Sequence, residues 1–144
     1  MDEAQKPHAR ILGLDVGDRR VGVALSDELG LTAQPVFTLT RKNRRQDLGT
    51  LARLVRKYNC TQVVVGNPLY MSGDVSPQAL KAQAFAQDLE KETGLAVTLW
   101  DERLSTTEAH RHLDAAGHQP GKRRDVIDQV AAVLILQSFL DSRR

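Results

Sequence analysis

The first apolar runs of the chain are short and closely spaced, which is the pattern of β-strands. Residues 11–16 and 21–25 are almost wholly apolar and are separated by the turn Gly-Asp-Arg-Arg, so they predict a β-hairpin. Residues 36–40 predict a third strand. Two further short runs, at residues 63–66 and 97–100, predict buried strands later in the chain.

Amphipathic stretches with helix-capping residues lie between these strands. Asn43 followed by Gln46 resembles a capping box, and the apolar residues after it recur with helical spacing. Ser76 and Pro77 have the N-cap and first-turn chemistry of a second helix, and Gly94 is a suitable C-terminal residue for it.

Two more helices are predicted in the C-terminal third. Ser105 and Glu108 form another capping box, which starts a helix that stops near Gly117. A basic loop at residues 118–124 then leads to an apolar final helix, for which Asp125 is the expected N-cap.

This order of elements predicts an α/β fold with one domain. A hairpin and a third strand come first, and helices and strands then alternate, which implies a five-stranded mixed sheet flanked by helices. We expect the domain to span residues 10–144 and residues 1–9 to form a flexible N-terminal tail. Functional groups of such sheets gather at the carboxyl ends of central strands.

Length and composition narrow the class of protein. A chain of 144 residues with 41% hydrophobic composition suits one compact domain. Its longest apolar stretch, residues 130–136, is far shorter than a membrane span, and its N-terminus lacks the apolar core of a signal peptide. A single cysteine, Cys60, rules out an intramolecular disulfide and agrees with a reducing compartment. We therefore expect a cytoplasmic protein with no membrane contact.

The net charge of +2 is small, but the basic residues are unevenly distributed. Such clusters attract phosphate backbones, although a run of charge is also common on an ordinary solvated surface. Two segments are basic: Arg41, Lys42, Arg44 and Arg45 form the first, and Lys122, Arg123 and Arg124 form the second.

Asp15 is the first of three acidic residues in unusual places. It shares one face of its strand with Ile11 and Gly13, so its side chain points into a layer where a helix is expected to pack. A carboxylate beside apolar elements is costly unless a positive partner lies next to it. The competing interpretation is an aspartate that caps the turn at Gly17.

Glu102 is the second acidic residue, and it follows a predicted strand directly. The connector to the next helix is short, so elements on both sides fix the direction of its side chain. A surface pair between Glu102 and Arg103 is the simpler explanation. Asp101 is a competing candidate that spacing alone does not exclude.

Asp128 is the third acidic residue, and with Asp125 it lies at the start of the final helix. The two are three residues apart and share a helix face. Helix capping and the helix dipole explain acids at this position. The helix is nevertheless apolar on almost every side, so its start is expected to be buried, where an acid requires a cation.

Three oxygen ligands flanked by basic segments suit Mg²⁺ or Mn²⁺ bound partly by protein and partly by substrate phosphate. Phosphodiester hydrolysis with two metal ions follows from this ligand set. Four motifs then carry a resemblance to a known family. They are Asp15-x-Gly17-x-x-Arg20-x-Gly22, Gly66-x-Pro68 with Gly73 beyond, Asp101-Glu102-Arg103-x-Ser105-Thr106, and Asp128-x-x-Ala131-Ala132.

With these motifs the chain resembles the YqgF/RuvX family over residues 10–140. The resemblance implies an RNase H-like fold related to the Holliday junction resolvase RuvC, and a nuclease that matures the 5′ end of 16S pre-rRNA. It also implies that Asp15, Glu102 and Asp128 are the catalytic metal ligands. Arg20 matches the family arginine, with a phosphate contact and an ion pair to an acid such as Asp18 as its two interpretations.

The sequence departs from the family pattern at two positions. Asn67 stands where an aliphatic residue is common, and Asp125 stands where a basic residue is common, so Asp125 is either a fourth carboxylate ligand or only a helix cap. We expect nucleic-acid contacts from the basic residues near the acids, namely Arg20, Arg44, Arg45, Arg103, Lys122, Arg123 and Arg124.

Three functions remain open at this stage. The first is a metal-dependent nuclease that processes pre-rRNA, and the second is a nuclease that acts on branched or single-stranded DNA. A junction resolvase makes two symmetric cuts and needs a homodimer, whereas an rRNA-trimming enzyme also works as a monomer. The third is a non-catalytic assembly factor in ribosome maturation or transcription, which has no use for acids in a phosphate-binding cleft.

Overall fold

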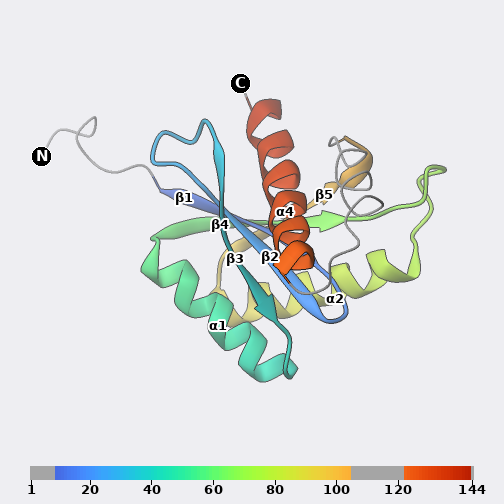
Figure 1. Cartoon of the computed structure of the whole chain (residues 1–144), viewed down its shortest axis with the longest axis horizontal. Helices are drawn as coiled ribbons and strands as arrows, with labels where there is room; N and C mark the ends of the chain where they lie inside the picture. Colours follow the sequence, from blue (N-terminus) through green and yellow to red (C-terminus); the bar gives the residue numbers. More distant parts are fainter. Residues whose placement is uncertain (1–8, 105–121, 144) are drawn as a thin grey trace, which may run out of the picture.

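The structure, a computed structural model, describes residues 9–104 and 122–143, except for the side chains of residues 122–125 (Figure 1). These ranges form a mixed sheet with the strand order β3-β2-β1-β4-β5. Strand β2 pairs antiparallel with both β1 and β3, whereas β4 pairs parallel with both β1 and β5. The elements are β1 (Arg10–Val16), β2 (Arg20–Ser26), β3 (Ala33–Thr40), α1 (Arg44–Lys57), β4 (Cys60–Asn67), α2 (Pro77–Thr93), β5 (Ala96–Asp101), the 3₁₀ turn η2 (Glu102–Leu104) and α4 (Lys122–Ser142).

The predicted five-stranded mixed sheet is confirmed, and so are the caps of the first two helices. Asn43 Oδ1 accepts a hydrogen bond from the Gln46 backbone N–H at 2.9 Å, and Ser76 Oγ accepts one from the Ala79 N–H at 3.0 Å. Helix α2 ends at Gly94, whose φ of 73° is a left-handed conformation that favours glycine. Local capping chemistry therefore sets three of these four helix ends.

Three predicted boundaries are wrong, and the first is the start of β4, which lies at Cys60 and not at residue 63. Strand β3 begins at Ala33, ahead of the predicted residues 36–40, because its pairing with β2 continues past an irregularity near Val23. Helix α4 begins at Lys122, so its basic first turn is not a loop and Asp125 lies inside the helix and is not its N-cap. Lys and Arg are good helix formers, which lets the helix start before the residue with capping chemistry.

Other predictions fall outside the described part of the chain. The helix expected from Ser105 to Gly117 lies there, and so does the tail apart from Ala9. The side chains of Lys122, Arg123, Arg124 and Asp125 also lie outside it, so their roles remain predictions. Within the described ranges, no helix is both long enough and apolar enough to cross a membrane.

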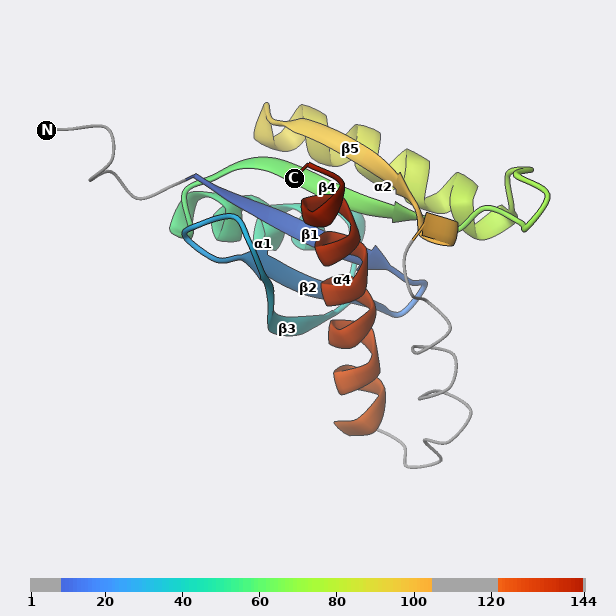
Figure 2. The same cartoon turned by 90° about the horizontal axis from the view of Figure 1, so that it is seen from above.

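The sheet separates two hydrophobic cores. Helices α1 and α2 cover one face, where Leu14 and Val65 pack with Leu51 and Phe85 (Figure 1). Helix α4 covers the opposite face, as the turned view in Figure 2 shows. On that side Val64 lies in a core formed mainly by α4 side chains, which are Ala132, Ile135, Leu136, Phe139 and Leu140.

Helix α4 lies unusually close to the sheet because three strands present glycines beneath it. A Cβ atom at Gly22 would lie 2.0 Å from the backbone oxygen of Asp128. Added Cβ atoms at Gly13 and Gly66 would lie 2.7 Å from Leu136 Cβ and 2.6 Å from Ile135 Cδ1, respectively. Real Cβ atoms do not approach other atoms so closely, so Gly22 and Gly13 leave no room for a side chain under α4, whereas at Gly66 the end of the Ile135 side chain would have to shift.

We predict that Gly22→Ala destabilises the protein by about 3 kcal/mol or more, because the added methyl group would force α4 off the sheet. Chemical denaturation measures this change. Gly49→Ala in α1 is the matched control, since a Cβ atom there meets nothing closer than Arg53 Nη1 at 3.7 Å. The control should be neutral or stabilise by up to about 1 kcal/mol, and equal losses in both variants would refute the steric argument.

Candidate active site

Asp15 lies near the carboxyl end of the central strand β1, on the face that α4 covers. Its cross-strand partner is Gly22 of β2, the glycine over which the Asp128 backbone passes. Gly13, two residues earlier on the same strand face, also contacts α4. The prediction that Asp15 points into a helix-packing layer is therefore confirmed.

Asp15 and Asp128 are brought together by this packing, although 113 positions separate them in the sequence. Burial raises the pKa of Asp15 from 3.8 to about 7, and the negative charge of Asp128 contributes further to the rise. A carboxyl group with such a pKa is a group whose charge the surrounding protein compensates incompletely. The pair therefore offers negative oxygen donors to a cation.

Arg20 is the positive partner of Asp128. Its Nε donates a hydrogen bond of 2.6 Å to Asp128 Oδ2, and the two side chains are only 26% and 19% exposed. The neighbouring Asp18, which the sequence offered as a partner for Arg20, pairs with Lys81 of α2 at 2.9 Å. Of the two interpretations of Arg20, the structure shows an ion pair, but with an acid from the far end of the chain.

Glu102 lies in the turn η2, directly after β5, and its carboxylate packs over Gly66 of β4. A Cβ atom at Gly66 would lie 3.1 Å from Glu102 Oε2. Residue 66 follows Val65, which pairs with Leu14, so Gly66 lies alongside Asp15 in the sheet. Glu102 therefore extends over the strand next to Asp15.

Ser138 of α4 fixes the turn that carries Glu102. Its hydroxyl accepts a hydrogen bond from Trp100 Nε1 at 3.0 Å and donates one to the Leu104 carbonyl at 2.9 Å. These two partners lie two residues before and two residues after Glu102. Sequence reasoning missed Ser138, and its only signal there is a hydroxyl beside Gln137 in the mostly apolar second half of the helix.

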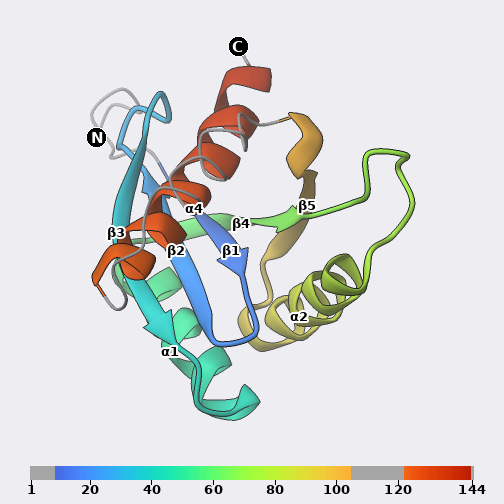
Figure 3. The same cartoon turned by 45° about the vertical axis from the view of Figure 1, so that its right-hand side comes forward.

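Asp101, the competing candidate beside Glu102, is engaged elsewhere. It pairs with Arg103 at 2.7 Å, and the hydrogen bonds from Arg103 lower the pKa of Asp101. Arg103 Nη1 also donates to the Met71 carbonyl at 3.1 Å. The pair thus anchors the long segment between β4 and α2, which Figure 3 shows extending away from the sheet.

The predicted nucleic-acid-binding arginines of α1 lie apart from the acids. Arg44 forms an ion pair with Asp88 of α2, and Arg45 lines a groove beside β3. Arg41, in the same basic segment, donates to Asp47 and to the Gly17 carbonyl, so it holds α1 against the β1–β2 hairpin. Among the predicted nucleic-acid-binding residues whose side chains the structure describes, Arg20 contacts a predicted ligand, Asp128.

The donor set fits a hard divalent cation held by few protein ligands. Within residues 9–104 and 122–143, no three acidic, histidine or cysteine side chains are close enough to form a complete metal cluster. Mg²⁺ commonly uses one or two carboxylates together with water and substrate phosphates. Asp15 and Asp128 supply such a pair, and Glu102 flanks it over Gly66.

A five-stranded mixed sheet with an acidic site at the end of its central strand defines the RNase H-like class of fold. The structure of Thermus thermophilus RuvC in complex with a Holliday junction substrate is similar, with a TM-score of 0.57 over 94% of this chain and 96% of that one. The two sequences are 12% identical, so the similarity concerns the fold.

The family model for RuvX, described as Holliday junction resolvase, matches residues 9–142, and the chain belongs to this family. A relative from Syntrophus aciditrophicus is 51% identical over 92% of this chain and 89% of its own length. One from Moorella thermoacetica is 52% identical over 92% of this chain and 94% of its own. Both carry the name "Putative pre-16S rRNA nuclease". The resemblance drawn from the motifs is confirmed.

We predict that Asp15→Asn stabilises the metal-free protein at alkaline pH. The folded pKa of about 7 exceeds the unfolded value of 3.8, so Asp15 binds its proton more tightly in the folded state. Its favourable contribution is complete below pH 4 and is lost as the pH rises to 7. In chelator, the variant should gain a few kcal/mol over the wild type at pH 8, with the gain shrinking towards pH 4. A pH-independent difference in urea denaturation would contradict this.

Proposed function

We propose that this protein is a divalent-metal-dependent nuclease that hydrolyses phosphodiester bonds, with the 5′ end of pre-16S rRNA as its substrate. The observation that supports the metal site is the convergence of Asp15 and Asp128 over Gly22, where the pKa of Asp15 is raised to about 7. The names of the relatives support the rRNA substrate. Pre-rRNA is a cytoplasmic substrate, so we expect the protein to act in the cytoplasm.

Asp15, Asp128 and Glu102 are the residues that would hold Mg²⁺ or Mn²⁺. When bound, divalent ions activate a water molecule and stabilise charge on the phosphate and leaving oxygens. The side chains provide oxygen donors on three elements, which are β1, α4 and η2. Ser138 keeps the turn that carries Glu102 against α4. A rigid frame of this kind holds ligands in position while the substrate binds.

Arg20 acts on the site through Asp128. The Arg20 Nε donates to Asp128 Oδ2, which leaves Asp128 Oδ1 available to a metal ion. Hydrogen bonds of this kind orient the side chains that bind metals. We therefore treat Arg20 as a positioning residue. Asp101 and Arg103 act in the same indirect way, since they anchor the segment that follows β4.

Cleavage of a Holliday junction is the second candidate function, and the similarity to RuvC supports it. Two symmetric cuts would need a homodimer with paired sites, whereas rRNA trimming proceeds with a monomer. A non-catalytic assembly factor is the third candidate. The half-buried acidic pair speaks against it, because the pair repels phosphate and destabilises the metal-free fold without benefit to a scaffold.

We predict that the purified protein cleaves a pre-16S RNA mimic with Mn²⁺ or Mg²⁺, and that Asp15→Asn and Asp128→Asn each reduce the rate at least about 100-fold. Asp74→Asn, in the exposed segment after β4, is the control acid and should retain activity. A four-way junction and single-stranded DNA are the comparison substrates. Any cleavage of the RNA mimic or of these two DNAs should stop when chelator is added.

Preference for the junction, together with a stable dimer in sedimentation, would support the resolvase instead. Binding of every substrate without metal-dependent cleavage would refute the nuclease and leave the assembly factor. Retained cleavage in Asp15→Asn would refute the proposed site even if the protein is a nuclease.

We predict that Arg20→Gln weakens Mn²⁺ binding about tenfold in calorimetry, because Asp128 loses the group that orients it. Arg20→Lys should recover part of the affinity, since it keeps the charge but not the planar geometry of the guanidinium. The opposite result, tighter Mn²⁺ binding in Arg20→Gln, would show that Arg20 only competes with the metal as a second cation.

A further inference from the structure

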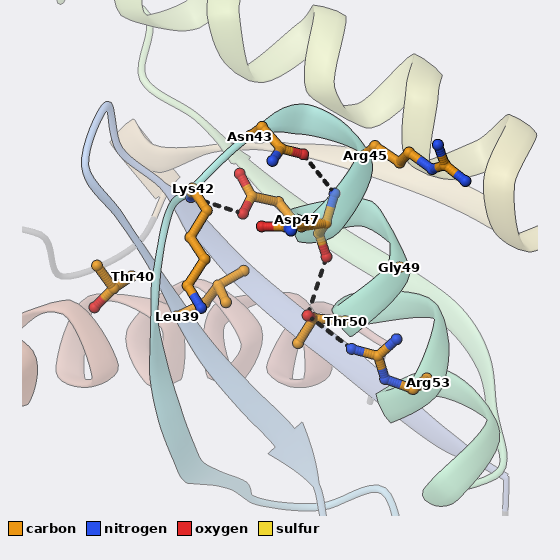
Figure 4. A pocket seen from close by; sticks show the side chains of 10 residues that line it. Leu39, Thr40, Lys42, Asn43, Arg45, Asp47, Gly49, Thr50 and Arg53 are labelled. Carbon is orange, nitrogen blue, oxygen red and sulfur yellow. Dashed lines mark hydrogen bonds between the residues drawn. The ribbon is translucent and has the colours of Figure 1, made fainter.

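A groove of about 720 Å³ lies between the end of the edge strand β3 and the first turns of α1, apart from the carboxylate site (Figure 4). Three basic residues line it, namely Lys42, Arg45 and Arg53. Within the described ranges, none of these three side chains has an acidic partner. The groove therefore presents uncompensated positive charge to a ligand.

The single acid in the lining does not cancel this charge. Asp47 is 2% exposed and already pairs with Arg41 at 3.2 Å. It also accepts a hydrogen bond from the Lys42 backbone N–H at 3.1 Å, which fixes the start of the groove. In Figure 4 the Lys42 side chain runs along the space between β3 and α1, and Arg53 reaches towards it past Thr50, whereas Arg45 extends away.

The groove begins next to the proposed active site. Thr40, which lines the groove, is the cross-strand partner of Arg20, and Arg20 holds Asp128. The Arg41 backbone N–H donates to the Arg19 carbonyl at 2.8 Å, so the segment before Lys42 is fastened to the β1–β2 hairpin. The groove thus lies on the α1 side of the sheet and the acids on the α4 side, and the two are linked at the end of β3 by the pairing of Thr40 with Arg20.

Gly49 leaves the helix wall of the groove open. An added Cβ atom would meet nothing closer than Arg53 Nη1, at 3.7 Å, which is an ordinary contact. Packing therefore does not require glycine there, and glycine weakens a helix relative to alanine. An unneeded glycine in the lining is consistent with space kept for a ligand.

We infer that this groove binds the phosphate backbone of the substrate strand beyond the cleavage site, an inference that rests on the proposed nuclease function. Unpaired Lys and Arg side chains bind phosphates with release of counterions and carry no sequence preference. The Thr40 hydroxyl and the side-chain amides of Asn43 and Gln46 lie in the same lining and are suitable donors to phosphate and sugar oxygens. The groove thus extends the binding site from the acids to α1.

The test measures binding in chelator, so it does not depend on cleavage. The probe is a fluorescent single-stranded RNA of about 30 nucleotides, long enough to reach beyond the acids. Lys42→Gln combined with Arg53→Gln should raise Kd about tenfold and reduce the slope of log K against log salt by about 1 to 2. Arg56→Gln combined with Lys57→Gln, in the last turn of the same helix, removes equal charge outside the lining and should change Kd less than about twofold.

Gly49→Leu tests the shape of the groove without a change of charge. Leucine is a good helix former, so the variant should fold, and its side chain should occupy the groove and weaken RNA binding severalfold. Thermal denaturation checks that each variant is folded. Unchanged binding in both groove variants, or equal loss in the Arg56 and Lys57 control, would overturn the inference. Weakened binding in groove variants of a protein that cleaves nothing would uphold the groove and refute only the nuclease.

Discussion

The contact between helix α4 and the glycines of the sheet is the constraint on which the site depends. A side chain at Gly22 would collide with the backbone of Asp128, so the strand must lack one for the helix to pass. The same contact places Asp128 beside Asp15, because Asp15 is the cross-strand neighbour of that glycine. Gly13 and Gly66 extend the contact along the helix. Close packing of backbone on backbone thus joins two acids from opposite ends of the chain.

This packing places two carboxylates close together, and the surrounding protein offsets their repulsion and desolvation only in part. Arg20 pairs with Asp128, but Asp15 remains a half-buried group whose pKa is raised to about 7. A protein selected for stability alone would replace such an acid with an apolar residue. Its presence is explained if a bound cation supplies the missing charge, which is why the energetics of the fold and the proposed chemistry point to the same residues.

Features of the fold that depend on neighbouring residues were predictable from the sequence. Short apolar runs predicted the five strands, and Asn43, Ser76 and Gly94 marked helix ends correctly through their own hydrogen bonds and backbone angles. Asp15 was identified because an acid stands out in an apolar strand. Capping chemistry failed at Asp125, where the helix had already begun with residues of high helix propensity.

Partners far apart in the chain were not predictable from local rules. Arg20 and Asp128 are 108 residues apart, and nothing in the spacing of either distinguishes this pair from a pair with Asp18. Asp101 and Arg103 are close in sequence, yet their joint role depends on the carbonyl of Met71 across the fold. Tertiary packing determines such pairs, and the spacing of apolar residues along the sequence carries no information about them.

The basic groove and the acidic site share one framework. Arg41 connects α1 to the hairpin, and it also stacks against Phe85 of α2 at 5.1 Å, so the strand end that carries Asp15 cannot shift independently of the groove. Positive and negative surfaces are thereby held at a fixed separation. Such an arrangement would let the proposed groove orient a polyanion while the acids stay available to the proposed metal, without mutual neutralisation.

Anomalous diffraction from crystals grown with Mn²⁺ would locate the metal without reference to any substrate, so it is the sharpest test of the proposed site. Our prediction is a strong peak between the carboxylates of Asp15 and Asp128, on the side of Glu102, which disappears in Asp15→Asn crystals. A peak at another place, or no peak at a Mn²⁺ concentration that supports cleavage, would contradict it.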